Sequence, residues 1–311
     1  MCLYIGNKEG YIAKKDIKCY KLLKKCGNSD TYVTPCQGWR IKFDTELIPD
    51  QKEPQIKEYG FKYILEGGAI HAFLDTRDNG YGSEGKIFEA IIPQGTRFWL
   101  QDDLKQIAAQ KIIITKKKAE TDACIDYSEF LYIAADVRLS DGSREFASEK
   151  LNPETVIGIY SGNKVVATEV VVKQFSENGP LTSTDGLRLF KDREESRKDK
   201  EGYQNTQNLK KLSQELPALK YCLEYETPGT SKGDWYLPAV GELMEIFLNL
   251  ESINLTLKIL GKKIIPYNWF WSSTVYSDQC AWRCYSNDCW YDWDCYGFWF
   301  YRFVLPFLEL S

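Results

Sequence analysis

Residues 233–243 read GDWYLPAVGEL, and residues 271–274 read WSST. Trp235 and Leu237 come directly before Pro238, a residue that suits the first turn of a helix. An apolar residue just before a helix can pack against its first turn. We therefore expect a helix over 239–250. The hydroxyl groups of the WSST stretch can tie a strand to neighbouring backbone. Both stretches predict scaffold and do not by themselves indicate a ligand.

The sequence on either side of these stretches predicts a mixed α+β unit. Two β-rich runs, 155–161 and 164–173, are joined by Gly162-Asn163, which is typical of a hairpin turn. Helices are expected over about 205–215 and 217–225, and another helical stretch should end near Gly261. From there to the C-terminus the chain is aromatic and strand-like.

Five short motifs occur in a fixed order in this half of the chain: YQNT (203–206), GDWYLPAVGEL (233–243), WSST (271–274), AW (281–282) and FVLPF (303–307). The series resembles the bacterial family related to the C-terminal domain of the Legionella collagen-like adhesin, and the similar Fibrobacter succinogenes major domain. The resemblance covers about 155–311 and implies a C-type-lectin-like fold. Leu305 stands where the family usually has Arg.

Residues 283–303 have a composition unlike the rest of the chain. They read RCYSNDCWYDWDCYGFWFYRF and contain no Lys, Glu, Gln or Met, although the chain as a whole has 40 Lys and Arg and 44 Asp and Glu. Every residue in the stretch except its three Trp can be encoded by a codon ending in C or T. Tyr and Trp give large, rigid contact area, and Ser, Asn, Asp and Gly give adaptable polar contacts. The content is typical of a ligand-binding surface.

This composition resembles the variable region of proteins diversified by retroelements, in which adenine-specific mutagenesis scatters AAC and AAT codons over NNC and NNT codons. Such regions lie at the C-terminal end of C-type-lectin-like folds. The resemblance implies a variable, ligand-binding face with fixed scaffold residues between its positions. The predicted face consists of Arg283, Cys284, Tyr285, Ser286, Asn287, Asp288, Cys289, Tyr291, Asp292, Asp294, Cys295, Tyr296, Phe298, Phe300 and Tyr301. The predicted scaffold consists of Trp235, Trp271, Trp282, Trp290, Trp293 and Trp299.

Other interpretations of the same stretch remain open. An aromatic core strand is one, although the Asp, Asn and Arg side chains argue against a core. A zinc site on Cys280, Cys284, Cys289 and Cys295 is another, but the gaps are irregular and no His lies nearby. Asp292 and Asp294 alone do not supply the six to eight oxygen ligands of a calcium site. We expect no metal and no cofactor.

The first part of the chain is less informative. Residues 1–117 are predicted to form a small α+β domain, with Asp102-Asp103 capping a short helix through Gln110. Residues 118–154 are expected to be a linker with a bridging strand, and 155–311 the ligand-binding domain. The single His, His71, is the only candidate imidazole for an enzyme in the first domain. A structural His71 is the alternative.

The net charge and the lack of targeting segments reduce the number of function classes that fit the sequence. The formal charge of −4 and the pI of about 5.4 lack the basic footprint of a nucleic-acid-binding protein. The N-terminus has no apolar region typical of a signal peptide, and no run is apolar enough to insert in a membrane.

We expect cytoplasmic synthesis with display outside the cell or on a virion, in a phage or prophage context. We expect no enzymatic activity, and a protein or glycan ligand on a partner or host surface. The alternatives are an enzyme around His71 and an assembly protein whose aromatic C-terminus is a subunit interface.

Overall fold

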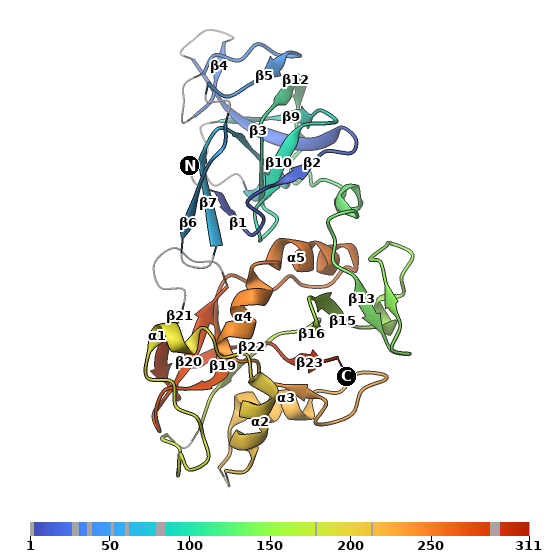
Figure 1. The fold of residues 1–311 in the computed structure, drawn as a ribbon. Coiled ribbons are helices and arrows are strands. Elements are labelled where there is room, and N and C mark those ends of the chain that lie inside the picture. The colour runs from blue at the N-terminus through green and yellow to red at the C-terminus, as the bar shows by residue number, and fades with distance from the viewer. Residues whose placement is uncertain are drawn as a thin grey trace. The chain divides into compact units, whose positions relative to one another are not determined.

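A computed structural model describes residues 3–26, 31–35, 39–50, 53–59, 62–78, 85–177, 179–212, 214–286 and 293–310. The chain divides into two compact units, Met1–Glu129 and Phe130–Ser311. Figure 1 shows the elements of each unit along the chain. The structure is α+β, with more strand than helix, as the sequence predicts for the chain as a whole.

The first unit is built from two antiparallel sheets. The smaller sheet has the order β1 (Leu3–Ile5), β7 (Lys62–Gly67) and β6 (Gln55–Tyr59). The larger has the order β2 (Tyr11–Ile12), β10 (Arg97–Leu100), β11 (Gln106–Ala109), β8 (Ile70–Phe73), β3 (Ile17–Lys25), β9 (Lys86–Ile92), β12 (Ile112–Lys118) and β5 (Glu46–Leu47), and β4 (Tyr32–Val33) pairs with β3.

The expected helix after Asp102-Asp103 does not form. Residues Gln106–Ala109 are a strand that pairs with β8 and β10, because Ile107, Ala108 and Ala109 are all buried between these neighbours. Across the described part of this unit there is no α-helix, only the 3₁₀ turns η1 (Thr76–Asp78) and η2 (Tyr127–Phe130). The expectation of a short helix from Asp102-Asp103 through Gln110 was therefore wrong.

The second unit contains a six-stranded sheet that begins before the predicted boundary. Its order is β14 (Arg144–Glu145), β13 (Val137–Leu139), β15 (Val156–Ser161), β16 (Lys164–Ala167), β23 (Phe307–Glu309) and β18 (Trp235–Tyr236). The hairpin of β15 and β16 is confirmed, with Gly162 at φ 61° in its turn. The strand β13 and the 3₁₀ turn η3 (Pro153–Thr155) lie in the stretch expected to be a linker. Because β13 pairs with β15 and buries Val137, residues 130–154 belong to the second unit.

A five-stranded sheet carries the C-terminal motifs. Its order is β17 (Val171–Gln174), β22 (Tyr301–Val304), β19 (Trp269–Val275), β20 (Cys280–Tyr285) and β21 (Trp293–Gly297). Neighbours are antiparallel except β19 and β22, which run parallel. The aromatic stretch that follows Gly261 therefore supplies four of the five strands.

Helices cover this sheet and the hairpin. Their bounds are α1 (Arg193–Ser196), α2 (Gly202–Lys210), α3 (Pro217–Glu224), α4 (Val240–Phe247) and α5 (Leu250–Ile259). The expected helices near 205–215, 217–225, 239–250 and before Gly261 are present, with shorter bounds. α4 packs against β19 and β20, α2 against β19, and α5 against β15. Figure 1 shows α4 beside the sheet.

The two motifs that open the sequence analysis meet at the start of α4. Thr274 Oγ1 accepts a hydrogen bond of 2.9 Å from the backbone N–H of Val240, one of the donors that the helix itself leaves unpaired. A Cβ at Gly241 would lie 2.4 Å from the carbonyl oxygen of Arg197, so only Gly fits there. Leu305, where the resembling family usually has Arg, is fully buried, and an apolar side chain suits that position.

Candidate ligand-binding surface

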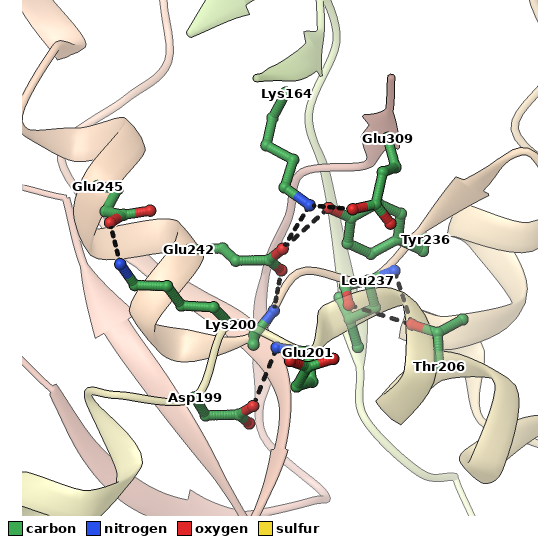
Figure 2. Close-up of polar contacts among 11 residues, drawn as sticks. Lys164, Asp199, Lys200, Glu201, Thr206, Tyr236, Leu237, Glu242, Glu245 and Glu309 are labelled. Atoms are coloured by element: carbon green, nitrogen blue, oxygen red, sulfur yellow. Dashed lines mark hydrogen bonds and ion pairs between the residues drawn. The ribbon is translucent and has the colours of Figure 1, made fainter. Parts of the chain in front are cut away.

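A buried polar network fixes α4 to the six-stranded sheet (Figure 2). Lys164 Nζ lies 3.1 Å from a carboxylate oxygen of Glu242 and 2.9 Å from one of Glu309. Glu242 also accepts hydrogen bonds from the Tyr236 hydroxyl at 3.0 Å and from the backbone N–H of Ala239 at 2.8 Å. Burial raises the pKa of the Glu242 carboxyl despite these partners. Burial opposes the charged form of Lys164, but Glu309 and Glu242 outweigh it and raise the pKa of Lys164.

A second buried carboxylate connects α2 to the five-stranded sheet. Asp199 accepts hydrogen bonds from the Thr274 hydroxyl at 2.7 Å, from the Asn205 side chain at 2.8 Å and from the backbone N–H of Glu201 at 3.1 Å. Figure 2 shows the last of these beside the bond between Thr206 and Leu237. The first network thus joins α4 to the six-stranded sheet and the second joins α2 to the five-stranded sheet. Side chains of the YQNT, GDWYLPAVGEL and WSST motifs take part in them.

The predicted scaffold residues that the structure describes divide into two groups. Trp235, Trp271 and Trp282 are buried, as expected, and Trp282 donates a hydrogen bond of 2.9 Å to the Phe190 carbonyl. Trp299 is 50% exposed, so its assignment to the scaffold was wrong. It sits in the turn between β21 and β22, over Gly297, where a Cβ would lie 2.6 Å from the Trp299 ring. Trp290 and the side chain of Trp293 lie outside the described residues.

The predicted face is exposed only in part. Tyr301 and Phe300 are exposed at 62% and 37%, and four further side chains are half-buried: Tyr285, Asp294, Cys295 and Tyr296. Asn287, Asp288, Cys289, Tyr291 and Asp292 lie outside the described residues.

Four predicted face residues are buried, and the expectation that they face solvent was wrong: Arg283, Cys284, Ser286 and Phe298. Arg283 and Cys284 lie on β20, which has strands on both sides. The Ser286 hydroxyl donates to the Pro266 carbonyl at 2.8 Å, which fixes the end of that strand. The Phe298 ring stacks on Phe175 in the apolar core at 4.6 Å. Composition identified the segment but did not show which of its side chains turn inward.

Arg283 is held between two aromatic rings. Its guanidinium carbon lies 3.7 Å from the centre of the Trp269 ring and 3.6 Å from the centre of the Tyr296 ring. Asp294 on the adjacent strand accepts two hydrogen bonds from it, at 2.5 and 2.9 Å. The planar guanidinium suits both the stacking and the paired contact with a carboxylate. Arg283 on β20 thus joins Trp269 on β19 to Tyr296 and Asp294 on β21.

The stack continues to the exposed turn. Arg302 lies 4.9 Å from the Tyr296 ring centre and 5.4 Å from that of Phe300, and the Tyr296 and Phe300 rings are 4.4 Å apart. We call these five residues the arginine–aromatic stack: Trp269, Arg283, Tyr296, Arg302 and Phe300. At its end, Trp299, Phe300 and Tyr301 are three consecutive exposed aromatic residues. Large exposed apolar groups in a cluster mark interaction sites.

Three residues of this surface were missed by sequence reasoning. Arg302 lay inside the unusual stretch but was not assigned to the face, and its position between Tyr301 and Phe303 was an available signal. Trp269 and Lys173 lie outside the stretch, and only strand pairing brings them to it. Trp269 is opposite Tyr285, and Lys173 is opposite Arg302.

His71 and the metal candidates can also be placed. His71 is buried on β8, where burial and the nearby charge of Lys21 lower its pKa to about 3. Its imidazole is therefore neutral at pH 7, and its Nδ1 atom has no hydrogen-bond partner. Among the residues with described positions, no group of three or more His, Cys, Asp or Glu side chains is placed to hold a metal ion. Cys289, one of the four Cys considered for zinc, is not among them.

These observations define an α+β protein with an aromatic surface on a small mixed sheet. No family model matches the chain, and no curated protein matches it. Among solved structures, a fimbrial protein from Bacteroides ovatus ATCC 8483 is similar, with 15% identity and a TM-score of 0.45. The match covers 84% of this chain and 68% of that one. A TM-score at this level establishes neither a shared fold nor a shared function. Within the described ranges, the helices are too short or too polar to cross a membrane.

Proposed function

We propose that the chain is a non-enzymatic recognition protein that binds a ligand through the surface around the arginine–aromatic stack. The observation that carries this proposal is the run of three exposed aromatic residues, Trp299, Phe300 and Tyr301, at the end of the ordered stack. Tyr, Trp and Arg are the residues that most often dominate binding energy at interfaces. Preorganised rings lower the entropy cost of binding. The ligand is a protein or glycan on a partner or host surface, and no metal takes part.

The neutral, buried His71 counts against the alternative of an enzyme around this residue. A catalytic imidazole needs a pKa near the working pH and access to substrate, and the low pKa and burial of His71 provide neither. The fold of the second unit is proposed to be C-type-lectin-like, on the strength of its ordered motifs, with a display role similar to that of an adhesin.

Binding is tested with the purified chain on a glycan array and a panel of purified cell-surface proteins. The double variant Trp299→Ala/Tyr301→Ala should lose at least tenfold in affinity for any ligand found. Phe146→Ala is the matched control, because this ring is 83% exposed in the same unit but outside the surface. Equal loss in the control, or full binding by the double variant, would overturn the proposal.

The variable character of residues 283–303 is proposed to come from a diversity-generating retroelement, in a phage or prophage setting. The missing Lys, Glu, Gln and Met codons support it. The test is genomic: a nearby reverse transcriptase gene and a near-copy of these codons that differs only at adenines are expected. A template that differs at other bases, or no template, would refute diversification and leave the binding surface as proposed.

A further inference from the structure

The paired strands β17 and β22 bring two cations to the same place. Lys173 is directly opposite Arg302 in the antiparallel register. Side chains directly opposite in such a pair point to the same face of the sheet, about 5 Å apart at Cβ. Two like charges in this arrangement destabilise a sheet. Lys173 and Arg302 thus form an unfavourable pair of like charges next to the exposed aromatic turn.

Neither cation forms an ion pair within the described residues, although the Asp294 carboxylate attracts Arg302 from a longer distance. No carboxylate from that part of the chain forms an ion pair with Lys173 or Arg302, whereas Arg283 in the same stack pairs with Asp294. The Nε atom of Arg302 is buried and has no hydrogen-bond partner. Its Nη1 atom donates to the neighbouring Tyr301 carbonyl at 2.7 Å, and its side chain also hydrogen-bonds to the Tyr296 hydroxyl. Burial and the charge of Arg283 lower the pKa of Arg302. An external anion beside the two side chains would relieve the repulsion between them.

The side chains around the two cations indicate which kind of ligand would bear the anionic group. The Tyr296 and Phe300 rings lie against Arg302, and Trp299 contacts Phe300 with ring centres 5.9 Å apart. A ligand that fits here combines a carboxylate with a ring that can stack on aromatic faces. Sugar rings stack on exposed aromatic faces of this kind, and a carboxylate on such a ring would meet the two cations beside them.

We infer that Arg302 and Lys173 bind the carboxylate of an acidic sugar, a sialic or uronic acid, whose ring stacks on Trp299 and Phe300. The inference deepens the proposed function and rests on it. Arg302 provides a planar donor group that can contact a carboxylate with two parallel hydrogen bonds. Lys173 adds a second positive charge, and Arg283 acts as a positioning residue because it fixes the Tyr296 ring beneath Arg302.

The test compares matched glycans that differ only in the acid group. Binding to 3′-sialyllactose is compared with binding to lactose, and a glucuronic-acid-terminated glycan with its glucose counterpart. We expect at least tenfold tighter binding of one acidic glycan than of its neutral partner, and weaker binding at high salt. Arg302→Gln/Lys173→Gln should remove this preference, and Lys232→Gln, at an exposed cation elsewhere in the unit, should keep it. Lys173→Gln alone should keep or raise the melting temperature, since it removes a repulsion.

Three other results would contradict the inference that an acidic sugar binds here. If neither acidic glycan binds better than its neutral partner, or an acidic peptide such as poly-glutamate competes equally well, the acidic sugar is not the ligand. If Trp299→Ala/Tyr301→Ala abolishes binding of another ligand while Arg302→Gln/Lys173→Gln does not, the proposed function survives and this inference fails. Arg302→Lys keeps the charge and should restore part of the preference, which separates a folding defect from a lost contact.

Discussion

The buried network around α4 and the arginine–aromatic stack use the same chemistry for different ends. In each, a cation lies over an aromatic ring and contacts a carboxylate: Lys164 with Tyr236 and Glu242, and Arg283 with Tyr296 and Asp294. Glu242 is 2% exposed, whereas the Asp294 side chain is 36% exposed. The network joins helix to sheet, and the stack leads outward to Trp299 and Tyr301. Burial, and not residue type, separates the network that supports the fold from the surface proposed to bind a ligand.

Removing the central acid of the network should have the largest effect on stability. Glu242→Ala leaves Lys164, the Tyr236 hydroxyl and the Ala239 N–H without this partner. Loss of one member of a buried ion pair costs about 3 kcal/mol, and chemical denaturation should show that decrease in the free energy of unfolding. Glu245→Ala, on the same helix, is the control, because its ion pair with Lys200 is exposed and worth at most about 0.5 kcal/mol. Similar losses for both variants would mean that the network does not anchor α4.

Breaking the stack at Arg283 should have an intermediate effect. Arg283→Ala removes two ring contacts and the paired hydrogen bonds to Asp294, at a cost of about 2 kcal/mol. Arg283→Lys keeps the charge but loses the planar stacking group, so it should recover only part of the loss. Arg188→Ala is the control, since Arg188 also lies over a ring, Phe190, and pairs with Glu195, but is largely exposed. Thermal denaturation compares all three variants, and an equal effect of Arg188→Ala would show that the enclosure of Arg283 contributes nothing.

The contrast between the network and the stack also shows which structural features could be predicted from the sequence. The GDWYLPAVGEL stretch predicted the helix start, because a helix start depends on local order. The WSST stretch predicted hydroxyl groups that contact neighbouring backbone, as Thr274 does at the N–H of Val240. The unusual composition of 283–303 located the candidate surface. It could not show that Phe298 turns inward and Trp299 outward, because a single turn over Gly297 decides that.

Long-range pairing accounts for most of the remaining differences. Lys173 is more than a hundred positions from Arg302 in the chain, and only the register of β17 with β22 brings them together. In the first unit, Gln106–Ala109 follows acidic residues that suit a helix cap, yet its neighbours on both sides are strands. Local propensity is a weak guide wherever tertiary pairing can override it. The features that the sequence predicted correctly were therefore local ones, and the features that it missed depended on which strands pair.

The smallest expected effect is a dependence of the free energy of unfolding on pH, which comes from Glu242 in the buried network. Burial raises the pKa of the folded Glu242 carboxyl above its ordinary value near 4.3. The folded protein then holds this proton more tightly than the unfolded chain does. Its contribution to stability is complete below the unfolded pKa and decreases as the pH rises through the folded pKa.

Glu242→Gln removes that titration while every other acid stays the same. The free energy of unfolding of the native chain minus that of Glu242→Gln should therefore decrease as the pH rises from about 4 and then level off. Urea denaturation at a series of pH values measures it, and Glu245→Gln reports the change caused by removing an exposed carboxylate. A difference that grows with pH would mean that the ionised carboxylate, held by Lys164, is the favoured form. In that case the attraction of Lys164 would outweigh the burial of Glu242, and the pKa of the folded carboxyl would lie below its ordinary value instead of above it.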